Sequence, residues 1–195
     1  DTESLEDLAE AVLSEQHRGV DGAAAPFVMA ALQVYWTDLA SRFDEKQLPV
    51  ASPFGVCPVC ASLPVASVVR VGGQFEGYRY LCCSLCATQW HMVRVKCSHC
   101  ESTKGVEYQG IDGAGDTVLA ETCEECGSYR KVVNQEKDPM AEPLADDLAS
   151  LMLDLLMGEE TRFQRASANP LLYVAFAEEQ DEAGDALIDP ATPAA

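Results

Sequence analysis

The feature that most constrains the fold is a repeated arrangement of cysteine pairs in the middle of the chain. Four CxxC pairs occur, and the last two follow the first two at a constant offset of 40 residues. The paired cysteines are Cys57, Cys60, Cys83 and Cys86, and then Cys97, Cys100, Cys123 and Cys126. Because the whole set recurs at one offset, we interpret this region as two copies of one structural unit.

The cysteine spacing predicts metal binding. Two cysteines on one tight turn can direct both sulfurs at one ion, and two such turns complete a tetrahedral cage of four sulfurs. A cage of this kind leaves no position for water or substrate, which is typical of structural or electron-transfer centres and disfavours Lewis-acid catalysis. The spacing suits zinc and a single iron equally. A thioredoxin-like redox pair is disfavoured, because that chemistry uses one CxxC in a βαβ unit.

The ninth cysteine, Cys82, lies outside the repeat. The 40-residue offset places Thr122 at its equivalent position, whereas Cys83 and Cys86 correspond to Cys123 and Cys126. We therefore interpret Cys82 as a small, half-buried strand residue, with a redox or resolving thiol as the alternative.

The net charge and the distribution of the cysteines limit which partners and which cellular compartment are expected for this protein. The chain has 13 basic and 32 acidic residues, a net charge of −19 that repels phosphate backbones, so nucleic acid is not an expected partner. An odd number of cysteines confined to residues 57–126 favours metal in a reducing compartment over a disulfide framework. No basic-then-apolar leader and no apolar run of about 20 residues is present, so we expect a cytoplasmic protein without membrane insertion.

Helices are expected on both sides of the cysteine repeat. Apolar residues at helical spacing predict one helix over residues 3–15 and a longer one from Phe27, whose wide apolar face should be buried. A last amphipathic helix is predicted after residue 142, with Pro143 in its first turn and Gly158 at its end. Between them, residues 65–71, 77–81, 91–95 and 129–133 are predicted to form short strands of β-ribbons.

These elements predict an α+β fold with N-terminal helices, two tandem rubredoxin-like modules made of small β-ribbons, and a C-terminal amphipathic helix. The expected divisions are a helical segment at 1–52, a first module at 53–96, a second module at 97–137, a helix and docking segment at 138–175, and an acidic mobile tail at 176–195. Basic residues exceed acidic ones in the first module only, and we expect it to dock on the chain's own acidic helices, with a protein partner as the alternative.

Three stretches of the chain resemble the FdhE family of formate dehydrogenase accessory proteins. They are RYLCCSLCATQWHMVRVKCSHC, ETCEECGSYRKV and ADDLASLMLDLLMGEETRFQRASANPLLY. The resemblance is close over residues 53–173, and it includes Trp90 after the second pair and Asn169-Pro170-Leu171 after the last helix. The chain departs from the family pattern at two positions, where the family would have His at position 82 and Gly at position 61.

The resemblance implies a non-catalytic cytoplasmic protein that helps respiratory formate dehydrogenase to mature. It implies contact with the catalytic subunit of that enzyme, and iron in two mononuclear sites whose ligands are the eight paired cysteines, with zinc as a possible substitute. No catalytic residue follows from it. Two alternatives remain from the residues themselves, namely a rubredoxin-like electron-transfer protein and a zinc-ribbon protein whose metals are purely structural.

Overall fold

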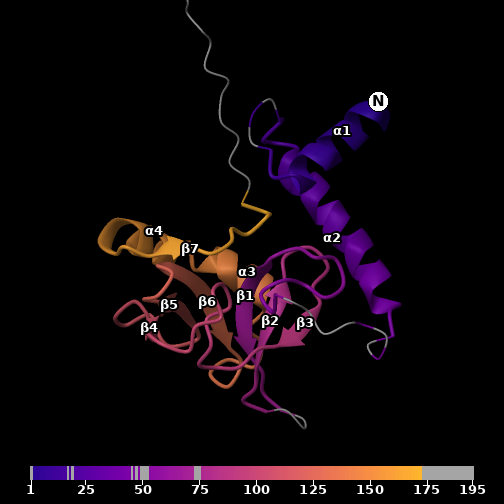
Figure 1. Cartoon of the computed structure of the whole chain (residues 1–195). Helices are drawn as coiled ribbons and strands as arrows, with labels where there is room; N and C mark the ends of the chain where they lie inside the picture. Colours follow the sequence, from indigo (N-terminus) through magenta and orange to yellow (C-terminus); the bar gives the residue numbers. More distant parts are fainter. Residues whose placement is uncertain are drawn as a thin grey trace, which may run out of the picture.

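The computed structural model describes residues 2–16, 18, 20–44, 46, 48, 53–72 and 76–172 of the chain. Two helices come first, α1 at Thr2–Leu13 and α2 at Ala25–Ser41 (Figure 1), which confirms both N-terminal helices. Pro26 lies in the first turn of α2, where its missing N–H would have had no partner within the helix. Val12 of α1 is buried together with Ala25 and Met29 of α2.

The apolar face of α2 is only partly buried, which corrects the expectation. Leu32 and Trp36 pack against the core of the first module. The apolar side chains beside this stripe are exposed to solvent, since Phe27 is 79% and Tyr35 is 60% exposed. The helix is therefore attached along one stripe, and the other side of α2 lies at the surface of the described chain.

The two modules share one sheet of seven strands. The first contributes β1 (Pro64–Val69), β2 (Arg79–Cys83) and β3 (Gln89–His91), and the second contributes β4 (Val106–Gln109), β5 (Val118–Cys123) and β6 (Ser128–Asn134). The strand order is β3-β2-β1-β6-β5-β4, and the short β7 (Gln164–Arg165) pairs with β6. Each module is an antiparallel set of three strands, so the sheet repeats the twofold pattern of the cysteines.

A parallel pairing of β1 with β6 joins the modules. Val68 lies opposite Val133 in this register, and both side chains are fully buried. The β-ribbons of the two modules thus form one continuous sheet, in which β1 is buried along its whole length and β6 along all but its last residue, and each strand covers an edge of the other.

The predicted C-terminal helix is interrupted at Ser150. The structure has α3 at Pro143–Ala149 and α4 at Leu151–Glu160, so the helix continues past the expected stop at Gly158. Lys131 of β6 donates hydrogen bonds to the carbonyl oxygens of Asp147, at 2.7 Å, and Ser150, at 3.0 Å. Backbone oxygens engaged in this way contribute less to a continuous helix, and the chain turns at that point.

Charged side chains buried under α3 and α4 fasten these helices to the sheet. Lys131 Nζ lies 2.5 Å from Asp154 Oδ2 and 3.5 Å from Asp147 Oδ1. Arg165 contacts the same two carboxylates, at 3.0 Å and 2.5 Å. Tyr129 donates a hydrogen bond to Asp154, and Asn169 donates one to Asp147. We call Lys131, Asp147, Asp154 and Arg165 the buried ion cluster.

The basic residues of the first module pair mainly with the second module, and not with the acidic helices as expected. Arg79 is fully buried and forms an ion pair with Glu121 of β5. Lys96 lies 2.6 Å from Glu101. The modules therefore neutralise each other's charge across the sheet. The predicted tail at 176–195 lies outside the described residues.

Candidate metal centres

The structure gathers the eight paired cysteines into two clusters of four. In the first cluster, Cys57 Sγ lies 3.6 Å from Cys86 Sγ and Cys60 Sγ lies 3.3 Å from Cys83 Sγ. The four ligand atoms of each cluster all lie within 4.8 Å of one another. Cys82 is in neither cluster.

The second cluster has the same geometry. Cys97 Sγ lies 3.8 Å from Cys126 Sγ, and Cys100 Sγ lies 3.7 Å from Cys123 Sγ. The pairing of first with fourth and second with third cysteine is that of the first cluster, shifted by the repeat. Among the described residues, these are the groups of three or more potential ligands that could hold an ion.

Each CxxC turn ends in a residue with left-handed backbone. The residues that follow the second cysteine are Ala61, Ala87, Glu101 and Gly127, with φ between 54° and 67°. This conformation folds the chain back so that backbone hydrogen bonds close the turn; for example, Ala61 N donates to Cys57 O and Cys57 N donates to Ser62 O. Only Gly adopts it without steric cost, so three of the four turns are held in a strained form.

Backbone N–H groups point at the sulfurs inside these turns. Cys83 Sγ accepts hydrogen bonds from the N–H groups of Leu85 and Cys86, at 3.4 and 3.5 Å, and Cys97 Sγ accepts one from His99 at 3.4 Å. Donors of this kind stabilise negative charge on sulfur, and in iron centres they raise the reduction potential. The backbone of these turns therefore stabilises the thiolate form of the cysteines.

The cysteine pKa values reflect the crowding of the four thiols. The hydrogen bond between Cys57 and Cys60 raises the pKa of Cys57 and lowers that of Cys60, and Cys57 also lowers the pKa of Cys86 to about 6. Burial raises the pKa of Cys126, but hydrogen bonds with Ser128, Cys100 and Cys123 together lower it to about 7. Each cluster therefore holds at least one thiol that ionises readily, and a cation would stabilise the remaining thiolates.

The donor set fits a single tetrahedral ion in each cluster. Metal–sulfur bonds of about 2.3 Å correspond to sulfur–sulfur edges of about 3.8 Å in a tetrahedron. The four sulfur–sulfur distances given above are 3.3 to 3.8 Å, and the other pairs of each cluster lie within 4.8 Å, so an ion requires only modest adjustments of the side chains. Four soft sulfurs suit zinc or iron, and the identity of the metal is not set by this geometry.

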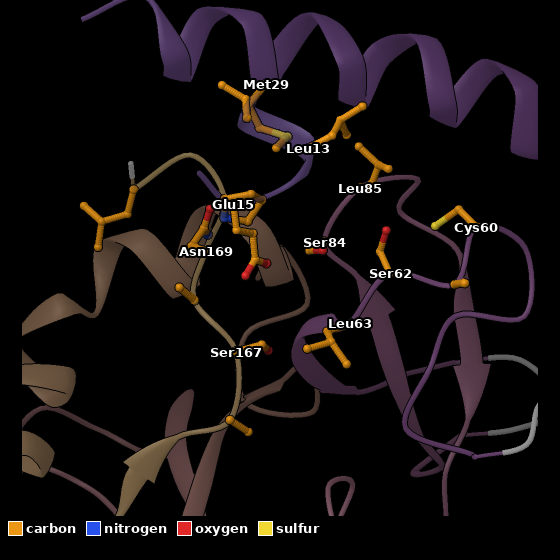
Figure 2. Close-up of a pocket in the computed structure, with 16 residues that line it drawn as sticks. Leu13, Glu15, Met29, Cys60, Ser62, Leu63, Ser84, Leu85, Ser167 and Asn169 are labelled. Atoms are coloured by element: carbon orange, nitrogen blue, oxygen red, sulfur yellow. The ribbon is translucent and has the colours of Figure 1, made fainter. Parts of the chain in front are cut away.

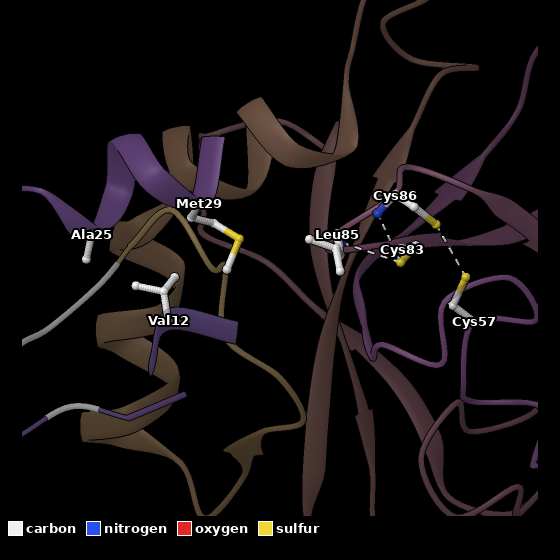
Figure 3. Close-up of a cluster of buried hydrophobic side chains, with 7 residues drawn as sticks. All are labelled: Val12, Ala25, Met29, Cys57, Cys83, Leu85 and Cys86. Carbon is white, nitrogen blue, oxygen red and sulfur yellow. Dashed lines mark hydrogen bonds between the residues drawn. The ribbon is translucent and has the colours of Figure 1, made fainter. Parts of the chain in front are cut away.

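The surroundings of the two clusters differ. Cys57, Cys83 and Cys86 are buried in an apolar cluster with Val12, Ala25, Met29 and Leu85 (Figure 3). In the second cluster Cys97 and Cys123 are buried, Cys126 is half-buried and Cys100 is exposed. The repeat therefore places the same four sulfurs in two environments, which the cysteine spacing alone does not reveal.

Cys82 and the side chains of His91 and His99 are not among the potential ligands of either cluster. Cys82 is 1% exposed and packs with Val65, Ala66 and Leu144, which fits its interpretation as a buried strand residue. Burial raises the pKa of Cys82 to about 12, so the thiol stays protonated and inert at neutral pH. His91 and His99 are exposed, and the ring of His91 lies against Tyr78 and Tyr80.

Family models of FdhE match consecutive parts of the chain. The N-terminal model matches residues 1–52, the model of the central domain matches residues 56–94, and the C-terminal domain model matches residues 95–172. The chain belongs to the FdhE family. The two cysteine clusters fall in the regions matched by the central and C-terminal FdhE domains, one in each.

Individual FdhE proteins are similar to this chain over most of its length. A protein FdhE homolog of Yersinia enterocolitica is 46% identical and covers 87% of the chain, and one of Cronobacter sakazakii is 45% identical over 88%. The crystal structure of the FdhE protein from Pseudomonas aeruginosa matches with a TM-score of 0.75 and 39% identity, over 85% of this chain and 58% of that one. The chain spans about half the length of the curated FdhE relatives it matches, 54% for the Yersinia protein and 55% for the Cronobacter protein.

Within the part of the chain that the structure describes, no helix has both the length and the apolar character required to cross a bilayer.

Proposed function

We propose that this protein is a non-catalytic accessory protein that binds the catalytic subunit of formate dehydrogenase during maturation and holds iron in two mononuclear sites. The observation that carries the proposal is the pair of four-sulfur clusters in a chain of the FdhE family. A cluster with four protein ligands offers a substrate no place at the metal, so the metals would stabilise structure or carry electrons. The eight paired cysteines are the proposed ligands.

The proposal includes the organisation and location of the chain. We propose that residues 1–52, 53–96, 97–137 and 138–175 are its working units, although β1 and β6 join two of them in one sheet. We also propose that the protein works in the cytoplasm, where a reducing environment keeps nine cysteines free of disulfides.

Metal identity is tested by elemental analysis and an optical spectrum of protein purified without air. We expect two irons per chain and the absorption of a thiolate-to-iron charge transfer. Two zincs and no visible absorption would instead support the alternative of structural zinc. Less than one metal per chain would contradict the assignment of the cysteines as ligands.

Partner binding is tested by retention of the catalytic subunit on the immobilised protein under anaerobic conditions. An unrelated protein of similar negative charge serves as the control, because a net charge of −19 attracts basic surfaces without specificity. Retention by this protein alone supports the proposal. Equal retention by both proteins, or by neither, refutes it.

A rubredoxin-like electron carrier is the second candidate function. The exposure of Cys100 favours it, because electron transfer to a partner requires a short path from the metal to the surface. Reversible bleaching of the iron spectrum, with rapid electron exchange with a dehydrogenase, would support this alternative.

A further inference from the structure

We infer that the two four-sulfur sites have different roles: α1 and α2 seal the first, whereas the second exchanges its metal with thiol-containing or chelating ligands from solution. The inference rests on the proposed metal binding, but not on the proposed partner. It is carried by the residues at the tips of the CxxC turns, by the cover over the first site, and by the exposure of the second.

The turns of the first site have apolar tips, and those of the second have polar tips. Val59 and Leu85 directly precede the second cysteine of their turns, and both belong to the apolar cluster around the first site. The repeat places His99 and Glu125 at the corresponding positions, and both are exposed. The CxxC turns of the first site therefore carry side chains suited to packing against another element, and those of the second site carry side chains suited to contact with water.

Helix α2 is attached to the first site. Met29 is buried in one apolar cluster with Leu85 and the buried cysteines (Figure 3). Leu32 and Trp36 pack against this cluster. Gln33 Nε2 donates a hydrogen bond of 2.8 Å to the carbonyl oxygen of Ser84, which lies inside the Cys83–Cys86 turn. The corresponding position in the second site is Glu124, which is exposed.

The half-buried residue of the first site, Cys60, borders a partly open cavity. The cavity has a volume of about 480 Å³ and lies between the helices, the Cys60 turn and the segment 166–172 (Figure 2). Leu13, Met29 and Leu85 line it, and Glu15 is the one charged residue among its described lining residues. An anionic chelator that approached Cys60 through this cavity would meet a lining of mixed apolar and uncharged polar side chains and the repelling carboxylate of Glu15, which disfavours its approach to the most accessible sulfur of the first site.

The second site is open at Cys100, the most exposed of the eight ligands. Ligand exchange there requires no oxidant. An incoming thiol releases its proton and its sulfur takes the place of Cys100 on the ion, while Cys100 leaves as a thiolate and takes up a proton from water. The charge and the oxidation state of the ion are unchanged, and three protein sulfurs hold it during the exchange.

The test begins with protein loaded with zinc and freed of excess metal. Elemental analysis must first give two zincs per chain. A lower zinc content would overturn the proposed metal binding itself, whereas failure of the present inference shows only in the release kinetics that follow. Zinc release to excess 4-(2-pyridylazo)resorcinol is then followed by absorbance. We expect two phases of one zinc each, with rates that differ by about tenfold or more, because the slow phase requires the apolar cover to open. A single phase that releases both zincs overturns the inference.

Variants assign the two phases. Met29→Ala loosens the cover and should accelerate the slow phase about tenfold while leaving the fast phase unchanged. The matched control is Phe27→Ala on the exposed side of the same helix, which should change neither. Gln33→Leu removes the link to Ser84 without opening a cavity, and it should also accelerate the slow phase alone.

The second site is assigned by Cys100→Ser. We expect this variant to lose the fast phase and to keep one slowly released zinc. If the slow phase is lost instead, or if Met29→Ala and Gln33→Leu leave the slow phase as Phe27→Ala does, the first site is not sealed by the helices and the inference is wrong. Circular dichroism of each variant confirms that the helices are still formed.

Discussion

Replacement of Lys131 by Met tests the role of the buried ion cluster. The ammonium group is fully buried and binds two carboxylates and two backbone carbonyl oxygens. Without it, Asp147 and Asp154 share the single cation of Arg165, and the cluster carries an uncompensated negative charge. Removal of one partner from a buried ion pair costs about 3–5 kcal/mol. We expect a value near the lower end, because Arg165 still contacts both carboxylates.

Urea unfolding of metal-loaded protein measures this cost. With a slope of about 2 kcal/mol per molar urea, a loss of about 3 kcal/mol lowers the midpoint by about 1.5 M. The matched control is Lys137→Met, because Lys137 pairs with Asp116 at the surface and both side chains are more than half exposed. The control should change the free energy of unfolding by less than about 1 kcal/mol. Equal effects of the two substitutions would refute the reasoning, since burial would then make no difference.

Three further substitutions test local features. Ala87→Gly should raise Tm, because the left-handed backbone at this position costs an alanine about 1 kcal/mol that a glycine avoids. Gly127→Ala at the equivalent turn should lower Tm for the same reason. The opposite signs would show that these turns are not strained. Cys82→Ser should leave two metals per chain by elemental analysis, and loss of one metal would show that Cys82 is a ligand. Gly55→Ala should lower Tm by several degrees, because the added methyl would lie 2.3 Å from the carbonyl oxygen of Ser98; an unchanged Tm would mean that the two loops move apart freely.

The cysteine clusters could be predicted from the sequence, because ligand spacing is a local property and the repeat identifies Cys82 as the extra residue. The helices could be predicted from periodicity. The single sheet could not, since the partner of an edge strand is not determined by the sequence of that strand. β5 was missed because it contains Glu121, a charged residue that is buried only because Arg79 of the other module pairs with it.

The difference between the two sites could have been found in the sequence. Val59 and Leu85 contrast with His99 and Glu125 at equivalent positions, and a comparison of the two copies residue by residue would have separated a covered turn from an open one. The interruption of the C-terminal helix at Ser150 could not be predicted by comparing the two copies. It depends on Lys131, a residue of another element whose side chain reaches the helix only in the folded protein.

The pairing of β1 with β6 has a consequence for the order of folding. Each cysteine cluster closes a short loop within its own module, whereas the pairing of β1 with β6 joins residues of different modules that lie far apart along the chain. Long loops cost more entropy to close, so the modules can form before the sheet that unites them is complete. We expect the earliest folding intermediate to bind metal and to lack a continuous sheet, with α3 docking last because it packs against both β1 and β6.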